Sequence, residues 1–99
     1  MWLFFRQIWR IRRYRCAVPA TKDQINRALG REIKAAYIRE GLTAEQVATK
    51  AGFSIGTMTR MLAGSDVPVS RLYLVADAIG VSPVKLVEAA VERAERDAT

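Results

Sequence analysis

Helix start and stop signals recur along this chain and restrict it to a series of short α-helices. Thr21 and Thr43 each begin a capping box, in which the hydroxyl accepts a hydrogen bond from the amide of a Gln three residues later. Glycine, which favours the positive φ of a helix C-terminus, follows four of the predicted helices. These stop residues are Gly41, Gly52, Gly64 and Gly80. No stretch of useful length alternates apolar and polar residues with a period of two, so we expect an all-α fold.

Apolar residues between these signals recur at helical spacing and predict five helices. In the first helix they occur every four residues, at Ile25, Leu29, Ile33 and Tyr37. Ser54 and Ser70 are expected to cap the third and fourth helices, and Ser82 precedes a Pro at the first position of the fifth. The fifth helix is expected to bury Val84, Val87, Val91 and Ala94. Five short helices with brief connections predict a compact bundle with a modest core.

Positive charge is concentrated at the N-terminus. Lys and Arg total 16 against 10 Asp and Glu, which gives a formal net charge of +6. Five arginines and no acid fall within the first 18 residues: Arg6, Arg10, Arg12, Arg13 and Arg15. Residues 19–99 hold the other 11 basic residues and all 10 acids, so their net charge is +1. This shift divides the chain into a basic, aromatic arm (residues 1–18) and a folded domain (residues 19–99), and the basic excess indicates a polyanionic partner.

Composition also excludes several classes of function. The chain has no His and one Cys, so imidazole-based catalysis, an intrachain disulfide and multi-Cys zinc sites are excluded. No pair of carboxylates is placed in an evident pocket, so we expect neither an enzyme nor a bound cofactor or metal. The longest apolar run, residues 1–5, is too short to span a membrane, and its arginines follow rather than precede it, unlike a secretory signal. We therefore expect a cytoplasmic protein.

A helix-turn-helix is predicted between Ala44 and Ala63. The second and third helices are joined by a tight turn at Gly52 and Phe53, and Ala48 is small where the two helices would cross. Inward positions carry spaced hydrophobic residues: Val47, Ala51, Phe53, Met58 and Met61. An ordinary corner between two helices, without any role in DNA binding, fits the same pattern.

The wider sequence resembles a known family. Residues 41–64 (GLTAEQVATKAGFSIGTMTRMLAG) resemble the helix-turn-helix of the XRE family, the Cro and lambda-repressor-like DNA-binding domains. Residues 69–87 (VSRLYLVADAIGVSPVKLV) resemble the fourth and fifth helices of that fold. The resemblance covers residues 25 to about 90. It implies a five-helix bundle that binds a double-stranded DNA operator as a transcriptional regulator, most simply a small Cro-like or phage immunity repressor.

The resemblance also assigns site residues by position, because the third helix of this family enters the major groove. The residues so implied for base readout are Ser54, Ile55, Gly56, Thr59 and Arg60. Arg60 suits guanine, Ile55 suits a thymine methyl, and Gly56 allows the backbone to approach the DNA closely. The residues implied for phosphate contact are Thr43, Thr57, Arg27, Arg31 and Lys34.

Three points limit this assignment. The family commonly has Gln where this chain has Ala44, so the resemblance implies no phosphate contact from that position. Thr57 and Thr59 are also compatible with a merely solvated face, and Arg60 with an ion pair to a nearby acid. The basic face of the first helix is equally compatible with simple solvation.

The arm has four interpretations. At helical spacing, Trp2, Phe5, Ile8 and Trp9 form an apolar face and arginines form a basic one. In the first interpretation the arm reaches the minor groove or backbone of DNA. In the second it is an extra helix that packs on the domain or across a dimer. The other two interpretations are a membrane-surface helix and an extension without fixed structure, even one produced by an upstream start codon.

Partners and function keep alternatives as well. A homodimer is one expectation, with residues 84–96 as its candidate surface. The same DNA-binding fold also occurs in antitoxins, which would add a toxin as protein partner. A third alternative is an interaction module that binds another protein or a membrane surface and no DNA.

Overall fold

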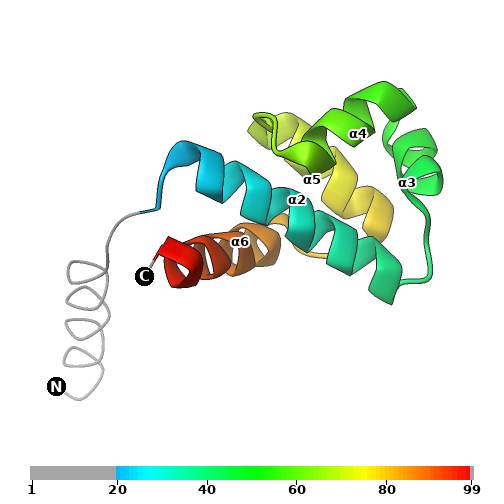
Figure 1. Cartoon of the computed structure of the whole chain (residues 1–99). Helices are drawn as coiled ribbons and strands as arrows, with labels where there is room; N and C mark the ends of the chain where they lie inside the picture. The colour runs from blue at the N-terminus through cyan, green and yellow to red at the C-terminus, as the bar shows by residue number, and fades with distance from the viewer. Residues whose placement is uncertain (1–19, 99) are drawn as a thin grey trace, which may run out of the picture.

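The computed structural model describes residues 20–98, which form five α-helices and, within that range, no strand (Figure 1). The helices are α2 (Lys22–Arg39), α3 (Ala44–Ala51), α4 (Ile55–Ala63), α5 (Val69–Ile79) and α6 (Pro83–Ala98). The all-α prediction is therefore confirmed. None of these described helices has the length and apolar character needed to cross a membrane.

Both predicted capping boxes are present. The amide of Gln24 donates to the Thr21 hydroxyl at 3.2 Å, and the Thr21 amide donates to the Gln24 side chain at 2.8 Å. The box that begins at Thr43 has the same geometry, and Ser54 caps α4 by accepting from the Thr57 amide at 3.1 Å. These bonds satisfy amides that a helix start otherwise leaves without partners.

The predicted cap of α5 is wrong. Ser70 lies inside the helix, and the chain enters α5 through Pro68, whose carbonyl accepts from the Leu72 amide at 2.9 Å. No side chain caps this helix. Pro68 begins it earlier than expected because its ring fixes φ at −59°, a value that already suits helix entry.

The core lies around α2, which packs against α4 and α6 on different sides (Figure 1). The predicted stripe of α2 is largely confirmed, since Leu29, Ile33 and Tyr37 are buried and Ile25 is half-buried. Gly30 lies within α2, beside this stripe, and costs about 1 kcal/mol relative to Ala in helix propensity. A Cβ at this position would lie 2.6 Å from the backbone oxygen of Leu62, so the close contact between α2 and α4 requires glycine.

The predicted inward face of α6 is partly wrong. Ala94 is buried as expected, but its buried neighbours are Leu86 and Ala90, while Val84 is 64% exposed and Val87 is 40% exposed. The alanines allow α6 to lie close to α2, where they are joined by the buried Ala28. Val91 is half-buried, and Arg93 of α6 donates to Glu32 of α2 at 2.7 Å, which holds α6 in the rotation that leaves Val84 and Val87 exposed.

Candidate nucleic-acid interface

α3 and α4 form a helix-turn-helix unit at one end of the molecule (Figure 1). The turn passes through Gly52 at φ +83°, a conformation that disfavours any residue with a Cβ. The Phe53 amide then donates to the Ala48 carbonyl at 2.8 Å, and the half-buried Phe53 ring packs against the core. The guanidinium of Arg71 in α5 lies over this ring, 5.6 Å from its centroid. Contacts from α3, from the core and from α5 thus hold the turn in place.

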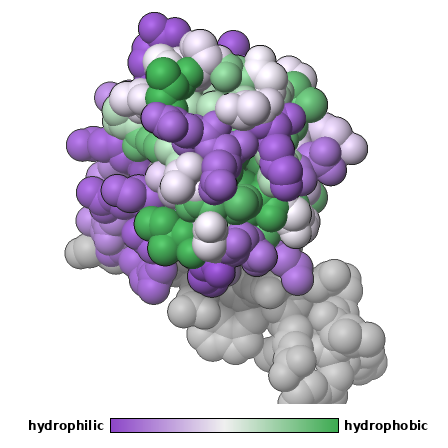
Figure 2. All heavy atoms as spheres, turned by 90° about the vertical axis from the view of Figure 1, so that its right-hand side faces the viewer, coloured by the Kyte–Doolittle hydropathy of each residue, from purple (hydrophilic) through white to green (hydrophobic). Residues whose placement is uncertain are grey.

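α4 has a buried face and a solvent face. Met58 and Met61 are almost completely buried and anchor the helix against α2 and α3. The residues predicted for base readout all lie on the exposed side: Ser54, Ile55, Gly56, Thr59 and Arg60. Figure 2 views the molecule from the end that lies to the right in Figure 1 and shows hydrophilic side chains interspersed with smaller hydrophobic patches. The structure therefore brings the five predicted residues together on an accessible helix surface.

Hydrogen bonds within α4 define what these side chains can still do. The Ser54 hydroxyl donates to the Thr57 hydroxyl at 3.0 Å, and the Arg60 guanidinium donates to the same Thr57 oxygen at 3.5 Å. Among residues 20–98, Arg60 forms no ion pair with a carboxylate, so the alternative of an acid partner does not apply there. The contact to Thr57 is at the outer limit for a hydrogen bond and leaves most guanidinium donors unused.

Thr59 is restricted in a different way. Its hydroxyl donates to the Ile55 carbonyl at 2.8 Å, which occupies its single proton. The oxygen can still accept a bond from a base donor, and the methyl group can still contact a thymine methyl. Ile55 is 49% exposed and can offer only apolar contact. α4 therefore presents one strong donor, one acceptor and two apolar groups.

Gly56 has no packing role among residues 20–98. Its φ lies outside the positive range, and the nearest atom to a Cβ built there is the Ser54 side-chain oxygen at 3.9 Å. Alanine would thus fit the described fold and would favour the helix. Unlike position 30, position 56 therefore makes no contact within the described fold that requires glycine.

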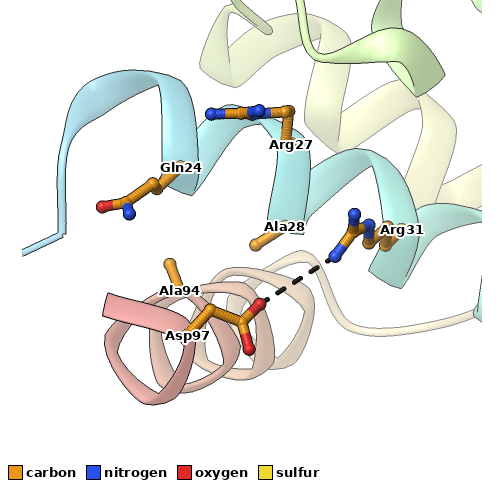
Figure 3. Close-up of a pocket in the computed structure, with 6 residues that line it drawn as sticks. All are labelled: Gln24, Arg27, Ala28, Arg31, Ala94 and Asp97. Carbon is orange, nitrogen blue, oxygen red and sulfur yellow. Dashed lines mark ion pairs between the residues drawn. The ribbon is translucent and has the colours of Figure 1, made fainter. Parts of the chain in front are cut away.

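The residues predicted for phosphate contact divide into two groups. Thr43 and Thr57 lie at the starts of α3 and α4, where free amides favour anions. Of the cations on α2, Lys34 is exposed, and Arg27 runs beside Gly64 at the end of α4. Arg31 instead faces α6, where it pairs with Asp97 at 3.9 Å beside an open hollow between the two helices (Figure 3). The five arginines of the arm lie outside the described residues.

Sequence reasoning missed one residue that positions α4. Asp66, in the connection from α4 to α5, accepts from the Asn26 side chain at 2.6 Å and pairs with Lys22 at 3.0 Å. Hydrogen bonds from Lys22 and then Asn26 lower the pKa of Asp66, and the bond to Asp66 raises the pKa of Lys22. The contacts tie the end of α4 to the start of α2. No local sequence signal could have found them, since 40 residues separate Asn26 from Asp66.

Comparisons with known proteins agree with this geometry. A family model described as a helix-turn-helix domain matches residues 9–90, which include α2 to α5 and the first half of α6. Among solved structures, the crystal structure of the clp gene regulator ClgR from C. glutamicum matches with a TM-score of 0.65. The two chains are 23% identical, and the match covers 69% of this chain and 90% of that one, so the fold is shared. No curated protein sequence matches the chain.

Proposed function

The chain belongs to the helix-turn-helix domain family, and from this premise we propose that it regulates transcription by reading double-stranded DNA through α4. Residues 19–99 form the DNA-binding domain in this proposal. The finer function is that of a small Cro-like or phage immunity repressor, which occupies an operator and blocks polymerase.

One observation carries the proposal. The buried methionines of α4 fix its position, while its outer surface places Ile55, Thr59 and Arg60 in solvent without a partner from another helix of the described chain. A helix with one locked face and one free, chemically varied face is suited to insertion into a major groove. The open space around Gly56 supports a close approach of the DNA at the start of this helix.

The roles of the side chains follow from the donors and acceptors they retain. Arg60 can release its long bond to Thr57 and form a bidentate pair with guanine O6 and N7. Thr59 accepts from a base or contacts a thymine methyl, and Ile55 contacts a thymine methyl. Ser54 already donates to Thr57 and caps the helix, so its remaining capacity is as an acceptor of a base donor.

Phosphate contacts are proposed for two kinds of residue. Thr43 and Thr57 lie where the positive ends of α3 and α4 supplement a hydroxyl. Arg27 and Lys34 are exposed cations on α2 that can approach the DNA backbone. Arg31 contributes in the same way only after it leaves Asp97, so its expected contribution is smaller.

Selection of bound sites from random duplexes tests the proposal. The full chain, Arg60→Ala and Lys85→Ala are compared at one salt concentration; Lys85→Ala removes the same charge from α6 and serves as control. We expect the parent and the control to enrich one shared sequence, while Arg60→Ala loses preference at one base pair. The mass of the complex gives the number of chains per site. Failure to enrich any sequence, or an identical preference in Arg60→Ala, contradicts the assignment.

A further inference from the structure

An apolar stripe runs along one side of α6 without a partner among the described residues. Val84, Val87 and Val91 follow at i, i+3 and i+7, which places them on one side of a helix. Val84 and Val87 are exposed and Val91 is half-buried, and none of the three is among the hydrophobic residues packed against the core. We call this surface the valine stripe. Two exposed valines and a half-buried one along one side of a helix indicate an apolar contact that the described domain does not itself supply.

Acidic residues border the valine stripe. Glu88 and Glu95 come four residues after Val84 and Val91, so each lies one turn further along the same side of α6. At 100° per residue, Lys85 and Arg96 lie about 100° and 120° around the helix from Val84, so neither is on the valine stripe itself, although Lys85 is a neighbour of Glu88. The partner of the stripe should therefore combine apolar and cationic side chains.

The N-terminal arm has both properties in the same register. Trp2, Phe5 and Trp9 repeat the i, i+3, i+7 spacing of the three valines. Arg6, Arg10 and Arg13 lie beside them, and residues 1–18 hold no acid to weaken their attraction to the glutamates. The arm can therefore match the stripe both in spacing and in charge.

The arm also joins the domain at the correct place. The described chain that follows it enters α2 next to the C-terminal end of α6, because Gln24 of α2 lines the same hollow as Ala94 and Asp97 (Figure 3). From Ala94 back to Val84 is about 15 Å along the helix axis, and 18 helical residues span about 27 Å. The arm is therefore long enough to run along the whole stripe.

We propose that residues 1–18 dock on the valine stripe of the same chain, with the aromatic side chains on the valines and the arginines toward the glutamates. Charge distinguishes this occupant from two others. A second copy packed through the same stripe would bring a second set of glutamates to it, and the phosphates of DNA would meet those glutamates directly. The arm brings only positive charge.

Tryptophan fluorescence of the full chain reports on this docking without a label, since both tryptophans, Trp2 and Trp9, belong to the arm. The measurement is quenching by acrylamide, whose neutrality avoids attraction to the arginines. We expect both tryptophans to be protected at low protein concentration in the absence of DNA. The double variant Val84→Lys/Val87→Lys should raise the quenching constant severalfold and shift the emission to longer wavelength.

Matched variants control for general effects of the added charge. Val69→Lys changes a valine of α5 that is 82% exposed, and should leave quenching unchanged. Glu88→Lys should release the arm, whereas Asp77→Lys on α5 should not. Both acids are exposed, and circular dichroism checks that every variant remains folded.

Four results overturn the proposal. The first is parent tryptophans that are quenched as readily as in the unfolded chain. The second is equal quenching of the α6 variants and their controls. Protection that appears only with duplex DNA assigns the arm to DNA instead. Protection that rises with protein concentration, together with a doubled mass, assigns the stripe to a second copy.

Discussion

Alanine at position 56 is expected to stabilise the fold and to weaken DNA binding at the same time. In the free protein a Cβ at this position meets nothing closer than the Ser54 oxygen at 3.9 Å, so Gly56→Ala gains helix propensity without strain. That gain is about 0.5–1 kcal/mol, or about 2–8 °C in Tm for a domain of this size. If the backbone of α4 approaches DNA closely at Gly56, the added methyl group must collide with it.

The expected loss in binding is large enough to measure. Forcing a methyl group into a closely packed contact costs about 1–3 kcal/mol, which corresponds to a roughly 5- to 150-fold higher Kd. Thermal unfolding gives the stability and fluorescence anisotropy with a labelled duplex gives the Kd, both in one buffer. The two quantities should move in opposite directions, which a general loss of folding cannot produce.

Gly30→Ala is the matched control. Its Cβ would lie 2.6 Å from the Leu62 oxygen, so α2 and α4 must separate and the free energy of unfolding should fall by about 1–3 kcal/mol. A stabilised Gly56→Ala that binds DNA as tightly as the parent refutes the inferred close approach. A destabilised Gly56→Ala refutes the description of the free site.

Three further predictions concern charge. Lys34→Ala should make the dependence of log K on log salt shallower by about one unit. Arg31 already pairs with Asp97, so Arg31→Ala should change this slope less. Equal slopes for the two variants would contradict the different roles of Lys34 and Arg31. The pKa of Asp66 is lowered on folding, so its contribution to stability is present above its ordinary value of 3.8 and is lost as pH falls through the folded pKa. Asp66→Asn should therefore make unfolding less dependent on pH below about pH 4, which urea titrations at several pH values would measure. Arg93→Ala leaves Glu32, whose side chain is 14% exposed, without its partner and should lower the free energy of unfolding by about 1–3 kcal/mol; an unchanged urea midpoint would contradict this reading.

Local signals predicted most of the helix boundaries. The capping boxes at Thr21 and Thr43 and the glycine stops involve residues within one turn of each other, so the sequence contains all the information they need. α5 shows the limit of this approach. Ser70 and Pro68 are both acceptable helix starts, and the fixed φ of Pro68 decided between them.

The features that sequence did not predict depend on contacts outside the local sequence signals. The buried face expected for α6 and the one observed share Ala94 and have similar residue spacing. Which face is buried depends on the fit of Ala90 to α2 and on the hydrogen bond between Arg93 and Glu32, which are 61 residues apart. The sequence predicted that the readout residues belong to one helix, but their hydrogen bonds are visible only in the structure. The bond from Thr59 to the Ile55 carbonyl, which removes its donor, could not be assigned from sequence.

The most direct test of base reading by α4 is the ratio of two Kd values, for the selected duplex and for the same duplex with one base pair exchanged. At one salt concentration, phosphate contacts contribute equally to both and cancel in the ratio. For the guanine assigned to Arg60, the ratio of Kd values in the parent should correspond to a free-energy difference of about 1–3 kcal/mol. In Arg60→Ala the ratio should fall to near unity. An equal ratio in the parent and in Arg60→Ala at every base pair of the site would contradict the account.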